Sequence, residues 1–299
     1  MALRVGIIGW GEIAKTHFSK IIKLGGEVSA IVSQKKVLDI DIPVYNSVYD
    51  MFPNVDAVTI AVPNYLHTSF CLAAVSAGKP VYVEKPICIT EKELNELDDV
   101  LPKLKIPVHV GYRLRWNPKV IKLRERINRV KKISCMYNLE MKELDANKGW
   151  TRKYKMSGGS FFALGVHALD LARWLAGARG EPLVDFSAFT GGIEDTCDFP
   201  LHVQLSGILP SGIRIIAGAD LRSGTPYSFN IEIEADKGSY PDSILHPPVI
   251  DDEDYIAEAY HMAVMPYQGF YIGFALIFNP VSYTHLRAHE TRHEVVCRL

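Results

Sequence analysis

Apolar runs and helix-length segments alternate along the first third of the chain. Five runs rich in β-branched residues are each long enough for a buried strand: LRVGII, EVSAIVS, VDAVTIAV, KPVYVE and IPVHVGY. The clearest helix lies in TEKELNELDDVLPKL, with Thr90 as N-cap, Glu93 at the capping-box position and leucines three to four residues apart. This alternation predicts a parallel sheet with helices on both faces.

The pattern changes in the second part of the chain. The segments KKISCMYNLEM, HVQLSGILP, GIRIIAGADL and YSFNIEIEAD alternate polar with apolar residues. Such strands are typical of an antiparallel sheet with one face on helices. A second domain of different architecture is therefore expected.

Composition and charge exclude several classes of protein. With 299 residues, of which 48% are hydrophobic and 22% charged, the chain is long enough for about two domains. No apolar run reaches the ~18–20 residues of a membrane span, and no secretory signal opens the chain, so we expect a cytoplasmic protein with no membrane partner. A net charge of −1 gives no reason to expect a nucleic-acid partner. Five scattered cysteines indicate free thiols in a reducing compartment.

A glycine turn follows the first expected strand. In GIIGWGEIAKTH, Gly9, Gly11 and Ala14 form a G-x-G-x-x-G/A arrangement. Gly9 permits a tight turn, Gly11 lets a pyrophosphate approach the backbone, and Ala14 lets the following helix pack on the strand. This context favours a Rossmann-type dinucleotide site over a plain strand-to-helix turn.

The end of the second strand bears on which dinucleotide binds. An NAD site expects an acid about twenty residues after the glycines, whereas a 2′-phosphate needs a hydroxyl or a cation. Here Ser33 takes that place, followed by Lys35 and Lys36. NADP is therefore favoured over NAD, although the lysines could be plain solvated loop residues and Asp39 and Asp41 keep NAD open.

Several motifs together resemble a known family. Residues 61–87 contain a P-N-x-x-H turn, an A-G-K step and an E-K-P motif, and GYRLRWNP at 111–118 and SGGSFFALGVHALD at 157–170 follow. With the glycine turn, they are similar to the Gfo/Idh/MocA oxidoreductases over nearly all of residues 3–240. The resemblance implies NAD(P)-dependent hydride transfer to or from a CH–OH group of a small molecule, such as a sugar or a related hydroxy or carbonyl compound.

The same resemblance implies an α/β fold in two domains. We expect a Rossmann-type parallel sheet at residues 1–116 and an α/β domain with an open, mostly antiparallel sheet at residues 117–280. In the family this second sheet forms the substrate wall and often an oligomer interface, so a homo-oligomer is expected.

Lys85 and His167 are the candidate catalytic residues. Alcohol oxidation requires an acid/base for the hydroxyl proton, and Lys85 follows a strand whose end faces the ligand crevice of such sheets. A solvated lysine and a packed structural histidine are the plainer interpretations. Asp170, three residues beyond His167, could orient the imidazole or cap its own helix. The resemblance implies that Lys85 is catalytic and that His167 faces the substrate and shares its proton.

Further site residues follow from the matched motifs. The expected cofactor set is Gly9, Trp10, Gly11, Glu12, Ile13, Ala14, Ser33, Lys35, Lys36, Pro63, Asn64, His67, Glu84 and Lys85. The expected substrate set is weaker, since its loop residues could equally face solvent or an interface: Arg113, Trp150, Arg152, Tyr154 and His167.

One departure concerns the position four residues before His167. Many dehydrogenases of the family read D-x-G-x-H there, whereas this chain has Ala163. The missing carboxylate argues against polyol-type recognition. It makes a non-catalytic NAD(P)-binding regulator the alternative to an enzyme.

The last residues contain a different motif. His289, Glu290 and His293 form H-E-x-x-H, a spacing that holds zinc on a helix. The surrounding VSYTHLRAHET, however, resembles translated sequencing-adapter DNA. We therefore expect residues 281–299 to be a non-native tail and expect no metal site.

Overall fold

The computed structural model describes most of the chain and divides it into two compact units. The first contains residues 1–111 together with residues 262–267 and 270–275, and the second begins at Tyr112. The expected domain bounds, 1–116 and 117–280, stay a prediction. The tail with the H-E-x-x-H motif and both Lys35 and Lys36 lie outside the described residues. The described residues are 2–34, 37, 40–145, 149–178, 180–193, 197–235, 238–245, 262–267 and 270–275.

A six-stranded parallel sheet forms the centre of the first unit, as the sequence pattern predicts. Its strand order is β3-β2-β1-β4-β5-β6, and every neighbouring pair is parallel. Five of its strands coincide with the five apolar runs, and the short β3 was not predicted. The strands are β1 (Arg4–Ile8), β2 (Glu27–Val32), β3 (Val44–Tyr45), β4 (Ala57–Ile60), β5 (Val81–Val83) and β6 (Val108–Val110).

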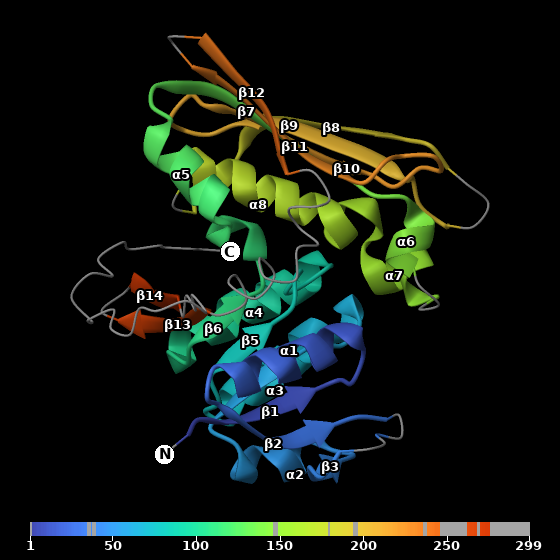
Figure 1. Ribbon diagram of the computed structural model, residues 1–299, viewed down its shortest axis with the longest axis vertical. Coiled ribbons are helices and arrows are strands. Elements are labelled where there is room, and N and C mark those ends of the chain that lie inside the picture. Colours follow the sequence, from blue (N-terminus) through green and yellow to red (C-terminus); the bar gives the residue numbers. More distant parts are fainter. Residues whose placement is uncertain are drawn as a thin grey trace. The chain divides into compact units, whose positions relative to one another are not determined.

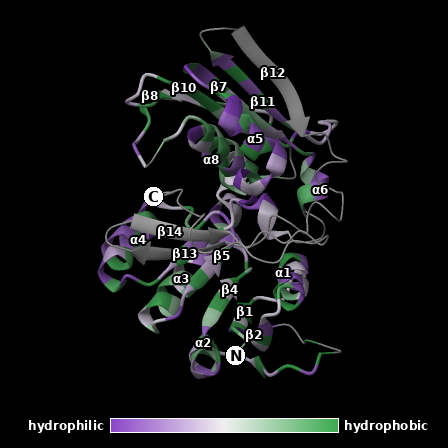
Figure 2. Ribbon diagram, turned by 60° about the vertical axis from the view of Figure 1, so that its left-hand side comes forward, coloured by the Kyte–Doolittle hydropathy of each residue, from purple (hydrophilic) through white to green (hydrophobic). Residues whose placement is uncertain are grey.

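Helices cover both faces of this sheet. Figure 2 shows α1 on one side of β1 and β4, and α3 and α4 on the other. The predicted capping box is present, since the Thr90 side chain accepts from the Glu93 N–H and the Glu93 carboxylate accepts from the Thr90 N–H. The helical segments are α1 (Glu12–Lys23), α2 (Val48–Met51), η1 (Phe52–Asn54), η2 (Asn64–Leu66), α3 (His67–Ser76) and α4 (Glu91–Leu104).

Strand β1 contributes to two hydrophobic layers. Successive side chains of a strand point to opposite faces. Ile7 therefore packs with Ala14 of α1, whereas Ile8 packs with Ile60 and Leu97 in the layer under α3 and α4. Because both faces of β1 are buried, the turn that follows it is held firmly at the middle of the sheet.

The second unit contains a mixed, mostly antiparallel sheet of order β12-β11-β7-β10-β9-β8, which confirms the expected fold class. Only β7 and β10 pair in parallel within it. Its strands are β7 (Val130–Asn138), β8 (Val184–Gly191), β9 (His202–Ile208), β10 (Arg214–Asp220), β11 (Ser228–Ala235) and β12 (Gly238–Leu245). Separately, β13 (Met262–Tyr267) and β14 (Phe270–Ala275) pair as an antiparallel hairpin.

One face of the second sheet is covered by helices. Figure 1 shows α5 and α8 along this face, where Leu171 of α8 lies in one core with Ile133 of β7 and Ile215 of β10. Within the described ranges, no helix covers the other face, and none of the helices is long and apolar enough to cross a membrane. The helical segments are η3 (Arg113–Trp116), α5 (Pro118–Arg126), α6 (Met141–Asp145), η4 (Trp150–Arg152), α7 (Tyr154–Ser157), η5 (Phe161–Gly165) and α8 (Val166–Leu175).

Candidate active site

The glycine turn joins β1 to α1 and has the shape that a pyrophosphate requires. Gly9 has a φ of +101°, and a Cβ there would lie 2.3 Å from the carbonyl oxygen of Ala61. Gly11 is the N-cap of α1, and a Cβ on it would meet nothing within 4 Å. No side chain caps this helix end, so its free N–H groups and positive dipole end suit a phosphate. The residues present therefore fit a dinucleotide.

The turn lies beside the end of β4, at the point where the strand order reverses. Gly9 N–H donates to the Val32 carbonyl, and Ala61 N–H donates to the Ile8 carbonyl, both at 2.9 Å. Ligands of open α/β sheets bind at this switch point, outside the carboxyl ends of the strands. Pro63 and Asn64 follow directly after β4, and Asn64 is buried.

The remaining residues around the turn differ in exposure. Glu12 is exposed and pairs with Lys15, Ile13 is exposed, and Trp10 is half-buried with its ring edge-on to Phe18. Half-buried Ser33 follows β2, and its N–H donates to the Tyr45 carbonyl at 3.3 Å. Because Lys35 and Lys36 lie outside the described residues, the NADP preference stays a prediction.

Lys85 lies on a loop that several contacts fix just after β5. Lys85 itself is half-buried and precedes Pro86 through a cis peptide bond. Glu84 N–H donates to the Ile60 carbonyl at 3.0 Å, and the Thr68 hydroxyl donates to the Ile87 carbonyl at 2.9 Å. The loop therefore holds Lys85 at the carboxyl end of the sheet, where the sequence predicts it.

The side chain of Glu84 is held by a buried histidine of α1. His17 is 3% exposed, and its Nε2 lies 2.8 Å from Glu84 Oε1. Burial acts to raise the pKa of Glu84, but the His17 hydrogen bond and the charges of His17, Lys85 and His67 outweigh burial and lower it. Glu84 is accordingly a carboxylate at neutral pH.

His67, expected in the cofactor site, contacts backbone carbonyls with both ring nitrogens. Nδ1 lies 2.6 Å from the Pro86 oxygen and Nε2 lies 2.8 Å from the Val62 oxygen, while the residue is 1% exposed. Burial lowers the pKa of His67, and the two carbonyls oppose this effect. The imidazole thus ties the turn after β4 to the lysine loop. Contact of His67 with a cofactor stays a prediction.

In the second unit, His167 lies in the first turn of α8 among aromatic rings. It is 5% exposed, and its ring centroid is 6.2 Å from that of Tyr112 and 5.8 Å from that of Tyr137. Lys85 belongs to the first unit and His167 to the second, so the pairing of the two remains a prediction. Ala163, in η5, is buried.

Asp170 has a partner that the sequence did not suggest. Arg115 donates to both carboxylate oxygens of Asp170, with Nε 2.8 Å from Oδ2 and Nη2 on Oδ1, and both side chains are largely buried. Burial raises the pKa of Asp170, against the charge and hydrogen bonds of Arg115. The pair joins η3 to α8, so Asp170 fixes the position of the His167 helix through Arg115.

The candidate substrate residues occupy the segments before α8. Arg113 lies in η3, Trp150 and Arg152 in η4, and all three are half-buried. Tyr154 begins α7, is exposed, and its N–H donates to the Asp198 carboxylate at 2.6 Å. Contact of these residues with a substrate stays a prediction.

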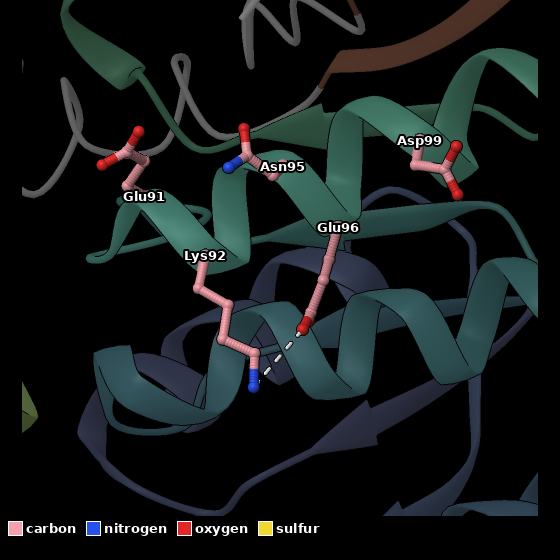
Figure 3. Close-up of a pocket in the computed structure, with 5 residues that line it drawn as sticks. All are labelled: Glu91, Lys92, Asn95, Glu96 and Asp99. Carbon is pink, nitrogen blue, oxygen red and sulfur yellow. Dashed lines mark ion pairs between the residues drawn. The ribbon is translucent and has the colours of Figure 1, made fainter.

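Neither a metal-ligand cluster nor a binding site in the hollow on α4 is found among the described residues. In the described part of the chain, no three His, Cys, Asp or Glu side chains gather where they could hold a metal ion. Figure 3 shows a hollow on α4 whose lining side chains are all exposed, with Lys92 and Glu96 paired at 3.8 Å. The lining residues are Glu91, Lys92, Asn95, Glu96 and Asp99. Exposed, solvated charges such as these do not make a binding site.

The strand order, the glycine turn and the switch point define a dinucleotide-binding α/β protein with a second sheet domain. The family model described as "Oxidoreductase family, NAD-binding Rossmann fold" matches residues 3–112. The model "GFO/IDH/MocA C-terminal domain" matches residues 123–241. The chain therefore belongs to the Gfo/Idh/MocA family of oxidoreductases, and the resemblance noted from its motifs is confirmed.

Known relatives are distant in sequence. The chain is 27% identical over 182 residues to the rhizopine catabolism protein MocA of Rhizobium meliloti, covering 58% of this chain but only 57% of that protein. It is 23% identical over 269 residues to the myo-inositol 2-dehydrogenase of Thermotoga maritima, covering 83% and 78%. The structure of the WlbA dehydrogenase of Chromobacterium violaceum in complex with NADH and UDP-GlcNAcA matches with a TM-score of 0.70 at 22% identity, over 87% and 82% of the two chains. This last likeness shows the fold alone.

Proposed function

We propose that the chain is an NAD(P)-dependent dehydrogenase or reductase that acts on a CH–OH group of a sugar, a sugar derivative or a related hydroxy or carbonyl compound. The observation that carries this proposal is Lys85, which a fixed loop presents at the carboxyl end of a dinucleotide-binding sheet. The myo-inositol 2-dehydrogenase among the relatives supports the substrate class.

In the proposed mechanism the chain binds, orients and moves a proton. The nicotinamide ring of the bound cofactor supplies the hydride acceptor or donor. The turn from Gly9 to Ala14 holds the pyrophosphate at the N-terminus of α1. Lys85 takes the hydroxyl proton as the carbonyl forms and returns it in the reverse direction, and His167 assists this proton transfer and orients the substrate, as the family resemblance implies.

We propose NADP as the preferred cofactor, with NAD as the alternative. The support is Ser33 at the end of β2, where an NAD site has an acid, together with Lys35 and Lys36 in the sequence after it.

We further propose a cytoplasmic homo-oligomer that uses the second sheet. In the strand register, Phe189 of β8 lies opposite Gln204 of β9, and Gln204 lies opposite Gly218 of β10. Ala217, the residue before Gly218, faces the helices. Because side chains alternate along a strand, Phe189 lies on the face without helices. Its side chain is strongly exposed on β8. Phe189→Glu should reduce the molar mass measured by light scattering, and an unchanged mass would count against this interface.

Turnover and cofactor binding, measured separately, test the proposed enzyme. Wild-type protein should reduce or oxidise its cofactor with a member of a polyol, sugar and sugar-nucleotide panel. Lys85→Ala should lose about 10²–10⁴-fold in kcat, as expected for a lost acid/base, while the affinity for NADPH measured by fluorescence is kept.

A non-catalytic NAD(P)-binding regulator is the rival function. It is motivated by Ala163, which leaves no carboxylate at a position where many relatives of the family have one. Wild-type protein that binds NADPH but shows no hydride transfer across the panel would favour the regulator. In that case Lys85→Ala would have no turnover to remove.

A further inference from the structure

Both neighbours of Lys85 in the sequence are held by buried histidines. His17 bonds the side chain of Glu84 on one flank, and His67 bonds the carbonyl of Pro86 on the other. His17 belongs to α1 and His67 begins α3, and Figure 2 shows these helices on opposite faces of the sheet. The lysine loop is therefore fixed from both faces, and on the α1 side the contact is made to a charged group.

The surroundings of Glu84 are crowded with titratable groups. Besides His17 from α1, the charges of His67 from α3 and Lys85 from the same loop act on it. A Cβ on Gly111 would lie 2.6 Å from the Tyr82 hydroxyl and 3.4 Å from Glu84 Oε1. The hydroxyl of Tyr82, a residue of β5, therefore also lies near the Glu84 carboxylate. His109 of β6 lies behind Tyr82, with ring centroids 5.3 Å apart. The His17 imidazole is the side-chain partner that holds this half-buried carboxylate in place.

An acid/base lysine has to pass between ammonium and amine in each turnover. A carboxylate free to pair directly with its ammonium would stabilise the charged form and hinder proton release. In the structure, Oε1 of Glu84 is already bonded to His17, which limits how far the carboxylate can turn.

We propose that His17 is a positioning residue for Lys85: its hydrogen bond anchors the Glu84 carboxylate on α1 and prevents it from closing onto the lysine ammonium. This role rests on the proposed function, in which Lys85 is the acid/base. His17 acts through Glu84 and need not touch substrate or cofactor.

The titration of Lys85 tests this role without relying on turnover. Full-length protein carrying ¹³C-labelled lysine is titrated by NMR, with the Lys85 signal assigned by Lys85→Arg. His17→Leu should raise the Lys85 midpoint by about one pH unit, because the released carboxylate pairs with the ammonium. Glu84→Gln should lower the midpoint by a similar amount, because the charge is gone. His17→Gln, which keeps an N–H donor at this position, should restore the midpoint to near its wild-type value.

Kinetics supply a second readout. His17→Leu should lower kcat at neutral pH by about tenfold, corresponding to one unit of pKa, and leave the KM for the cofactor nearly unchanged. Lys23→Gln, an exposed substitution in the last turn of α1, is the matched control and should alter neither the midpoint nor kcat. If His17→Leu does not fold, His17→Asn provides the same comparison, since its amide is too short to reach Glu84.

The possible outcomes separate the two proposals. A Lys85 midpoint unmoved in His17→Leu or His17→Asn, or moved downward, overturns the role of His17 even when the wild-type protein turns over substrate. Opposite shifts in His17→Leu and Glu84→Gln support that role even if no substrate is found, and the absence of turnover would then count against the proposed enzyme alone.

Discussion

Substitution by alanine should have different consequences at the two glycines of the β1–α1 turn. Gly9→Ala places a methyl group 2.3 Å from the Ala61 carbonyl oxygen and 3.0 Å from Val62 Cγ1, at a φ of +101°. Gly11→Ala places it in open space at an extended backbone conformation, with φ −88° and ψ −174°. The first should damage the fold, and the second should damage only cofactor binding.

The magnitudes follow from these contacts. A non-glycine residue held at such a positive φ costs about 1–3 kcal/mol, and forcing a methyl group against fixed backbone adds about 1–3 kcal/mol. Gly9→Ala should therefore lower the free energy of unfolding by about 2–6 kcal/mol, and Tm by about 2–4 °C for each kcal/mol. Gly11→Ala should leave stability unchanged or raise it by up to about 1 kcal/mol, because alanine restricts the unfolded chain.

Thermal unfolding without cofactor and fluorescence titration with NADPH measure the two effects. Gly11→Ala should keep its Tm and weaken NADPH binding by about tenfold or more, equivalent to at least about 1.4 kcal/mol, because the methyl group occupies the space of the pyrophosphate. A Gly9→Ala protein as stable as wild type would refute the packing argument. A Gly11→Ala protein that binds NADPH normally would refute the assignment of the pyrophosphate to this turn.

Three further predictions concern charged and polar residues. Arg115→Leu should lower the free energy of unfolding, measured by urea titration, by about 3–5 kcal/mol, because it leaves the Asp170 carboxylate buried without its cation. A much smaller loss of unfolding free energy would contradict this. The Arg4 hydrogen bond holds the pKa of Asp56 at about 2, below its usual 3.8, so this pair stabilises the fold above pH 3.8 and loses that effect as the pH falls through 2. Wild type should thus lose more Tm than Asp56→Asn on acidification through this range, and parallel losses would contradict the sign. Ser33→Asp should shift the affinity ratio of NADPH to NADH toward NADH by repelling the 2′-phosphate, and an unchanged ratio in fluorescence titrations would refute the role of Ser33.

The fold was largely predictable because strand and helix patterns are local. Buried parallel strands read as continuous apolar runs, and all five such runs in the first unit became strands. The structure adds β3, which is too short to show a pattern, as well as β12 and the β13–β14 hairpin. It also adds β8, whose apolar side chains at Phe186 and Phe189 are exposed instead of forming a core. Propensity alone does not say which face of an edge strand is covered.

The candidate site was predictable only where a motif marks it. The glycine turn and the lysine loop lie at the carboxyl end of the sheet, as expected, because parallel strand order places them there. The contacts of His17 with Glu84 and of Arg115 with Asp170 were missed, since each joins residues far apart in the sequence. The sequence does place His17 on the apolar side of an amphipathic helix, which indicates a buried histidine. That pattern does not indicate which residue its ring contacts.

The central place of β1 has a consequence for how the protein is made. During synthesis β1 emerges before its two neighbours in the sheet, and β2 can pair with it soon afterwards, but the other neighbour, β4, begins only at Ala57. The carbonyl of Ala61, which closes against Gly9, comes later still. We therefore expect a nascent chain to acquire dinucleotide binding in one late step, when the second half of the sheet docks, so that ribosome-bound fragments ending before β4 should not be retained on an immobilised nucleotide.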